Sequence, residues 1–108
     1  MKYIVRVSIG AENDLASIAT YIARADSNAR ASRFVNELTK LISTLERFPR
    51  RGVVPKELVT VGSNDIRQLL IWDYRVIYEI FDKTVRVLVV VDGKRDLSSI
   101  LQKRHLSF

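Results

Sequence analysis

Four arginines stand in or directly after three apolar runs of this chain, and they are its strongest candidates for chemistry. The runs cover residues 66–72, 74–81 and 85–91, and the arginines are Arg67, Arg75, Arg86 and Arg95. A guanidinium group is a planar fork of hydrogen-bond donors that suits phosphate and carboxylate groups. Arginines displayed on a rigid scaffold therefore predict binding of an anionic partner. Simpler roles are open as well, since Arg67 could pair with Glu79 across two strands and Arg86 could extend into solvent.

The chain has fewer candidates for side chains that donate or accept protons in catalysis. His105 is the only histidine and lies near the C-terminus, where a solvated position is the simpler expectation. Tyr74 and Tyr78 fall on an apolar-rich side of the middle run and are expected in the core, with their hydroxyls reaching an edge. The chain has no cysteine, which excludes disulfides and thiolate metal sites. A cationic surface without a placed acid and base binds phosphate but gains little rate, and we expect no metal or cofactor.

The three apolar runs are predicted to form a meander of strands. Val, Ile, Tyr, Phe and Trp crowd them, and the polar breaks between them are too short for a crossover helix, so neighbouring runs must be antiparallel. Residues 2–9 alternate in polarity and predict a first strand. A connection of odd length around Asp73 would place Arg67, Arg75 and Glu79 on one face of the sheet.

Helical periodicity is found in two stretches, residues 11–25 and 28–47. Phe48-Pro49 ends the second stretch, because a residue before proline is pushed out of the helical region. Two helices joined by so short a link form an antiparallel hairpin, and Asp96 or Ser98 can cap a last short helix. The predicted fold is a single α+β domain over residues 1–108 in the order βααβββα. In it, an antiparallel sheet, made of the first strand and the meander, carries the hairpin and the short C-terminal helix.

The balance of charge is basic. The chain has 18 Lys+Arg against 12 Asp+Glu, a net charge of +6. Such an excess is typical of nucleic-acid binders and of partners of acidic proteins, with solubility alone as the plainer alternative. The first residues include Arg6 and do not form a signal-peptide core, and no apolar run approaches the roughly 20 residues that span a bilayer. We expect a cytoplasmic protein that does not enter membranes.

An ordered set of short motifs runs through nearly the whole chain. It comprises Asp14-Leu15, Ile18, Tyr21-Ile22, Phe34, Leu38, Leu45-x-x-Phe48-Pro49-x-x-Gly52, Ile66-Arg67-x-Leu69, Tyr74-Arg75-Val76-Ile77-Tyr78-Glu79 and Gly93-Lys94-Arg95-Asp96-Leu97, followed by Leu101 and Arg104. No single motif is specific. In this order they resemble the RelE/ParE superfamily of toxins from bacterial type II toxin–antitoxin (plasmid stabilisation-type) systems.

The resemblance implies a small α+β toxin made together with an antitoxin. One branch of the superfamily cleaves messenger RNA in the ribosome, and the other poisons DNA gyrase. Three signatures resemble the gyrase-directed, ParE-like branch: Asp14-Leu15, Phe48-Pro49-x-x-Gly52 and Arg95-Asp96-Leu97. Arg75 and Arg95 match arginines of the nuclease branch, and Arg67 stands where that branch often has a lysine. Two positions depart from it, since Leu69 replaces a second lysine and Leu101 a tyrosine.

The leading hypothesis is a toxin that inhibits gyrase by binding, has no catalytic residue and is neutralised by its antitoxin. Its candidate target- or phosphate-binding residues are Arg67, Arg75, Arg95 and Arg104, together with the tail 95–108. The alternative is a ribosome-dependent ribonuclease acting on messenger RNA. Its candidate catalytic residues are Arg75, Arg95, Lys56 and His105. A third hypothesis is a degenerate member of the family that only binds its antitoxin.

The resemblance also predicts the kind of partner. We expect an acidic, partly disordered antitoxin segment that folds on binding and forms a toxin–antitoxin hetero-oligomer. The wide apolar stripe of the second helix suggests that this segment lays a helix along an open groove of the hairpin. The residues expected to line that groove are Leu15, Ile22, Phe34 and Leu38.

Overall fold

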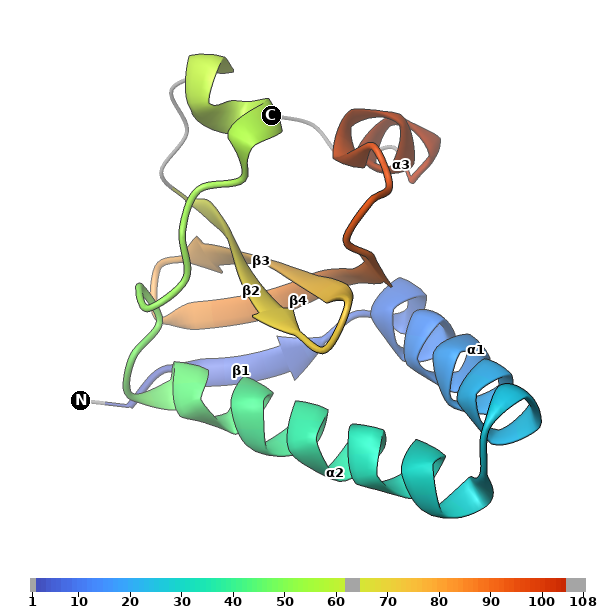
Figure 1. Ribbon diagram of the computed structural model, residues 1–108. Helices are drawn as coiled ribbons and strands as arrows, with labels where there is room; N and C mark the ends of the chain where they lie inside the picture. Colours follow the sequence, from blue (N-terminus) through green and yellow to red (C-terminus); the bar gives the residue numbers. More distant parts are fainter. Residues whose placement is uncertain (1, 62–64, 105–108) are drawn as a thin grey trace.

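The computed structural model describes residues 2–61 and 65–104, and their elements follow the predicted order βααβββα (Figure 1). The strands are β1 (Ile4–Val7), β2 (Ile66–Ile71), β3 (Tyr74–Phe81) and β4 (Thr84–Asp92). The α-helices are α1 (Ile9–Ala25), α2 (Asn28–Ser43) and α3 (Leu97–Lys103). Two 3₁₀ helices, η1 (Thr44–Glu46) and η2 (Lys56–Val61), occupy the connection between α2 and β2. No helix in this part of the chain is long and apolar enough to cross a membrane.

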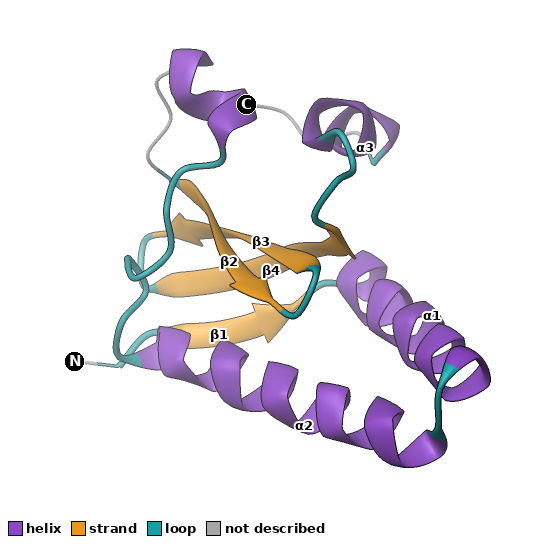
Figure 2. Cartoon of the chain, viewed as in Figure 1, coloured by secondary structure: helices purple, strands orange, loops and turns teal. Residues whose placement is uncertain are grey.

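The four strands form one mixed sheet in the order β1-β4-β3-β2 (Figure 2). The predicted antiparallel meander of β2, β3 and β4 is confirmed. The prediction of a wholly antiparallel sheet was wrong in one respect, because β1 pairs with β4 in parallel, with Ile4 opposite Thr84. The reason is the long connection that contains the helices, since a crossover of that kind allows a strand to join the sheet in the parallel sense.

The turn between β2 and β3 decides which arginines share a face. Only Trp72 and Asp73 separate the paired residues Ile71 and Tyr74, so the connection has even length. Trp72 takes a positive φ of 52°, as tight hairpin turns require. Arg67 therefore lies opposite Tyr78, whereas Arg75 lies opposite Leu70 on the other face. The odd-length connection that would place Arg67 and Arg75 on one face is therefore not the one present.

The sheet has an apolar core on each face. The α1–α2 hairpin covers one face, where Phe34, Leu38 and Leu45 pack with Val76 and Tyr78. On the other face η2 and α3 lie side by side over the sheet (Figure 1), and Leu58 and Leu97 join a second cluster with Ile77, Leu88, Val89 and Val91. Both layers follow from the apolar stripes, because each stripe must be buried against a sheet face.

A β-bulge in β4 determines which side chains of that strand face η2 and α3. Ile77 lies opposite Val89 and Tyr78 lies opposite Val87, so Leu88 is an extra residue in β4. Strict alternation would place Leu88 and Val89 on opposite faces. The bulge instead lets both side chains join the cluster under α3.

Helix caps explain the boundaries. The Ser8 hydroxyl accepts a hydrogen bond from the Ala11 N–H at 3.1 Å, so α1 begins at Ile9, two residues earlier than its periodicity predicts. Ser27 caps α2 by accepting from the Arg30 N–H at 3.0 Å. Of the two candidate caps for the last helix, the structure uses Asp96, whose carboxylate accepts from the Ser98 N–H at 3.3 Å.

Candidate functional site

Arg75 is the most deeply buried charged residue described, with only 4% of its surface exposed. It projects from β3 toward η2 and α3. Its Nη1 and Nη2 atoms each donate to one carboxylate oxygen of Glu57 at 2.8 Å, and its Nε donates to Gln68 Oε1 at 2.8 Å. Nη1 also reaches the Arg95 carbonyl at 3.3 Å. The guanidinium is therefore committed to partners inside the protein.

Glu57 completes this buried ion pair from η2. Hydrogen bonding to Arg75 lowers the pKa of Glu57 from its usual 4.5 to about 2, against the opposing effect of burial. The same carboxylate accepts the Leu97 N–H at 3.2 Å, at the first residue of α3. One carboxylate thus ties β3, η2 and the start of α3 together, which fixes the backbone from which Arg95 projects.

Arg104 makes a second internal ion pair. Its guanidinium forms a bidentate contact with the Asp14 carboxylate of α1, and its Nη1 donates to the Leu88 carbonyl at 3.1 Å. Asp14 Oδ2 in turn accepts the Val90 N–H at 2.9 Å. These contacts satisfy backbone groups of β4 beyond the end of β1, where α1, β4 and the end of α3 meet.

Arg95 differs from these two arginines because its side chain is exposed and makes no hydrogen bond or ion pair with the described residues. It lies at the rim of a cleft of about 310 Å³ between α1, the end of β4 and α3. The polar residues of that cleft include Asp14, Tyr21, Tyr74, Asp92, Arg95 and Arg104. Burial, and then the negative charge of Asp92, raise the pKa of Tyr74, so this hydroxyl stays protonated at neutral pH.

Arg67 holds a turn on the hairpin side of the sheet. Its Nη1 donates to the carbonyl groups of Gly52 at 2.8 Å and Arg50 at 3.3 Å. Tyr78 is fully buried; its hydroxyl donates to the Pro49 carbonyl at 2.7 Å and accepts the Gly52 N–H at 3.0 Å. The sequence prediction that Tyr78 lies in the core is confirmed, and its hydroxyl is buried as well.

Of the predicted catalytic residues that the structure describes, Arg75 is buried, whereas Lys56 and Arg95 are exposed. Lys56 is exposed at the start of η2, and Arg67 lies on the opposite sheet face from Arg75. His105 lies outside the described residues. Glu79, the predicted partner of Arg67, forms its ion pair with Arg86 at 2.9 Å instead. The described residues contain no group of three His, Asp or Glu that could hold a metal ion.

The predicted antitoxin groove on the hairpin is closed in this structure. Phe34 is 0% exposed and Leu38 is 1% exposed, Ile22 is also buried and Leu15 is half-buried, all in the cluster between the hairpin and the sheet. This prediction was wrong as a description of the free protein, because the apolar stripe of α2 packs on its own sheet.

Two features of the site were not found from the sequence. Glu57 lies 18 residues from Arg75 in an irregular segment, and no local pattern marks it as the partner. The edge strand β1 leaves large apolar side chains exposed, with Ile4 at 54% and Val7 at 37%. Alternation in residues 2–9 indicated a strand but not that it would sit at the edge.

The fold defines a class of protein. The chain is similar to "Chromosomal ParDE TA system from P. aeruginosa", with a TM-score of 0.72, 16% identity, and 86% of this chain and 98% of that chain covered. It is also similar to a mutant of the E. coli toxin RelE in complex with an antitoxin RelBc peptide, with a TM-score of 0.56, 18% identity, and coverage of 99% and 97%. The toxin–antitoxin complex RelBE2 from Mycobacterium tuberculosis gives a TM-score of 0.55, 24% identity, and coverage of 85% and 99%. The fold is thus that of small toxins from toxin–antitoxin systems.

A match to a family profile shows which family within this class the chain belongs to. The profile described as "ParE toxin of type II toxin-antitoxin system, parDE" matches residues 5–97. The chain therefore belongs to the ParE toxin family, and it is the toxin of a type II toxin–antitoxin pair with a cognate antitoxin as its partner. No curated protein sequence matches it.

Proposed function

We propose that this toxin inhibits DNA gyrase in the cytoplasm by binding it, without breaking a bond itself, and that its antitoxin neutralises it. One observation carries the proposal. Arg75, which matches an arginine of the RNA-cleaving branch, is 4% exposed and neutralised by Glu57. Its role here is to hold the scaffold, so a target must be bound by other side chains.

The same geometry argues against ribonuclease chemistry. Cleavage at a phosphate needs cations near the reacting phosphorus, a base and an acid within hydrogen-bond reach. Arg67 and Arg75 point away from each other on opposite faces, and both hydrogen-bonding functions of the Tyr78 hydroxyl are already used. Arg67, Arg75 and the Tyr78 hydroxyl therefore do not converge on one phosphate group.

Among the four arginines predicted to bind the target, Arg95 is the one that we assign to direct contact. It is exposed and free of described partners, and it sits between Lys94 and the cleft beside α3. Arg67, Arg75 and Arg104 act as positioning residues, because each donates to backbone or carboxylate groups of this chain.

Gyrase supercoiling by purified enzyme tests the proposal directly. Purified toxin should block supercoiling or trap cleaved DNA at near-stoichiometric amounts, and Arg95→Gln should weaken this effect. Arg24→Gln, which removes an exposed arginine from α1, is the matched control and should leave inhibition unchanged. Full supercoiling at excess toxin would defeat the proposal. Codon-specific cuts in translated message would establish the ribonuclease instead, and induction without a growth defect would indicate a degenerate, antitoxin-binding protein.

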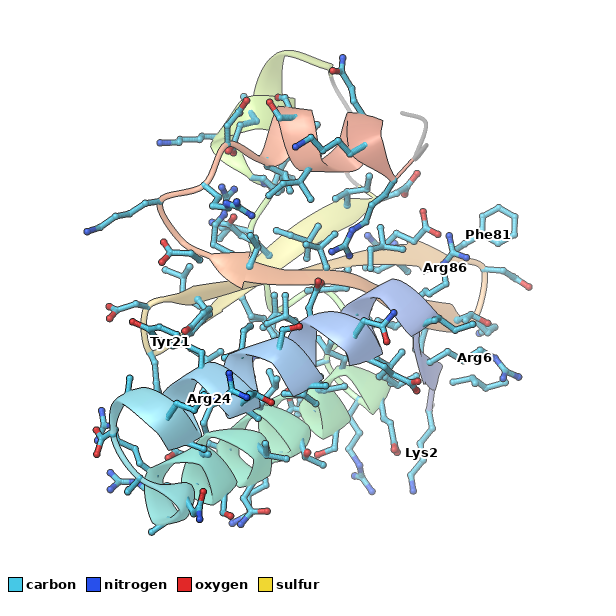
Figure 3. All side chains as sticks on the ribbon, turned by 90° about the vertical axis from the view of Figure 1, so that its right-hand side faces the viewer. Lys2, Arg6, Tyr21, Arg24, Phe81 and Arg86 are labelled. Atoms are coloured by element: carbon cyan, nitrogen blue, oxygen red, sulfur yellow. The ribbon has the colours of Figure 1, made fainter. Side chains whose placement is uncertain are left out.

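For the antitoxin we propose the outer edge of β1 as the docking site. The nitrogens of Ile4 and Ser8 donate to carbonyls of Lys83 and β4, so the alternate residues Val5 and Val7 turn their backbone groups outward. Exposed apolar side chains flank this edge, and the exposed cations Lys2 and Arg6 lie along it (Figure 3). An acidic segment that adds a strand there would satisfy the edge and complement the charge.

A backbone substitution tests this docking site. Val7→Pro removes an outward-facing N–H and leaves the pairing with β4 intact, so antitoxin affinity should fall about tenfold or more. Val7→Thr keeps that N–H and serves as the matched control. Equal affinity of both variants for the antitoxin would place the interface elsewhere.

A further inference from the structure

The turn that follows η1 presents cations and an aromatic ring together at one end of the molecule. We call residues 47–51 the basic turn; its exposed side chains are Arg47, Phe48, Arg50 and Arg51, and Phe48 is 63% exposed. Glu46 is the only acidic residue between positions 44 and 52. Arg47, Arg50 and Arg51 form no ion pair with the described residues, and the Arg51 guanidinium donates to the Thr44 hydroxyl at 2.8 Å.

Hydrogen bonds from strands β2 and β3 fix the backbone of the basic turn. Tyr78 accepts from Gly52 and donates to Pro49, Arg67 donates to the carbonyls of Gly52 and Arg50, and Val53 pairs with Gln68 of β2. Burial raises the pKa of the Tyr78 hydroxyl, and the hydrogen bond with Gly52, followed by the positive charges of Arg67, Arg51 and Arg50, partly offsets that rise. Several guanidinium groups are therefore crowded on a rigid support.

The N-terminal residues add to this end of the molecule. The Tyr3 N–H donates to the Glu46 carbonyl at 2.8 Å, so the start of the chain runs beside η1 (Figure 1). Lys2 is exposed directly before this contact. Crowding like charges is unfavourable for the isolated protein, and such a cluster is best explained by a ligand with closely spaced negative charges.

We propose that the basic turn binds the phosphodiester backbone of a single-stranded nucleic acid segment, with a base stacked on Phe48. Guanidinium forks match phosphate oxygens, and an exposed ring among cations is the usual arrangement for sequence-tolerant single-strand binding. A rigid turn loses little conformational freedom on binding, which favours affinity. This surface lies on residues other than Arg95 and the α3 cleft, so the inference goes beyond the proposed action on gyrase and does not depend on it.

Fluorescence anisotropy with a labelled single-stranded oligonucleotide tests this binding. Arg50→Gln/Arg51→Gln should raise Kd about tenfold and reduce the slope of log Kd against log salt by about 1.4, the value for two lost phosphate contacts on a single strand. Arg24→Gln/Arg33→Gln removes two exposed arginines from the hairpin and is the matched control. It should change Kd by less than about twofold, because these residues lie far along the helices from the basic turn.

Phe48→Leu separates stacking from charge. This variant keeps the charge of the turn, so it should weaken binding to the single strand about tenfold and leave binding to the matching duplex unchanged. Arms with DNA and RNA of the same sequence identify which nucleic acid is preferred. Thermal unfolding of each variant checks the fold, and Arg47→Gln/Arg50→Gln replaces the first pair if Arg51→Gln lowers stability through the lost Thr44 contact.

Three results would overturn the proposal. The first is an equal loss of affinity in the hairpin control, which would reduce the binding to net charge alone. The second is displacement of the oligonucleotide by polyglutamate of similar length at equal concentration, which would identify an acidic protein segment as the ligand. The third is absence of any binding at low salt.

Discussion

The Glu57 carboxylate receives both terminal nitrogens of the Arg75 guanidinium at 2.8 Å, and the pair is nearly excluded from solvent, with side chains 4% and 12% exposed. This contact turns an arginine that sequence places on a binding face into part of the internal framework. Breaking a buried pair of this kind costs more than breaking a surface pair, because it leaves one charge without a partner. Loss of either partner should therefore lower the stability of the fold, and with it the toxicity of the protein.

The first prediction concerns acid stability. Because the folded pKa of Glu57 is about 2, below its usual 4.5, the ion pair contributes its full stabilisation above about pH 4.5 and loses it as the pH falls toward 2. The shift corresponds to about 3 kcal/mol of unfolding free energy. Urea unfolding at a series of pH values should show this fall in the parent protein and a much flatter profile in Glu57→Gln. Glu12→Gln, at an exposed position of α1, should retain the fall.

Sequence reasoning reached the elements but not the contacts between distant segments. The 3.6-residue periodicity of α2 predicted one apolar stripe that includes Phe34 and Leu38, and the structure buries that stripe against the sheet and not in an open groove. Pairing of β1 with β4 joins residues about 80 positions apart, and nothing in the local pattern of either strand encodes that choice. The length of the Trp72–Asp73 turn decided which face Arg75 occupies, and an irregular segment supplied Glu57. Both depend on backbone geometry that composition does not specify.

The second prediction separates a positioning role of Arg75 from a contact with the target. Arg75→Met and Glu57→Leu should each cost about 3–5 kcal/mol of unfolding free energy, whereas the double variant should recover much of that loss because no charge stays unpaired. Growth arrest on induction should be weak in each single variant and return in the double variant. A double variant that is stable but harmless would mean that Arg75 itself contacts the target.

The third prediction concerns the Asp14–Arg104 pair at the edge of β4. Asp14→Ala removes the acceptor of the Val90 N–H, so hydrogen exchange at this amide should speed up by a factor of about ten or more, on the order of one lost hydrogen bond to a charged group. Arg104→Ala leaves that acceptor in place and should have a smaller effect on Val90. The control is Asp26→Ala, which breaks only the exposed pair with Arg30. Protection at Val90 that survives Asp14→Ala would show that this edge is satisfied in another way.

The fourth prediction tests how the basic turn is held. A Cβ added at Gly52 would come within 2.6 Å of both the Gln68 carbonyl oxygen and the Tyr78 hydroxyl, and neither the strand backbone nor a fully buried tyrosine can move aside cheaply. Gly52→Ala should therefore lower the free energy of unfolding by about 1–3 kcal/mol, as overpacking of a core does.

Tyr78→Phe removes the hydroxyl group that holds the backbone of the basic turn. It leaves the Gly52 N–H without its acceptor and the Pro49 carbonyl without its donor, which should cost about 1–3 kcal/mol. Gly93→Ala is the matched glycine control, since its nearest contact is a less severe 3.1 Å to the Asp73 carbonyl oxygen. Urea unfolding gives the stabilities, and oligonucleotide anisotropy gives the binding. If the turn must be rigid to bind, both Gly52→Ala and Tyr78→Phe should raise Kd even where the protein is fully folded. Unchanged affinity in folded variants would show that the arginines act without this support.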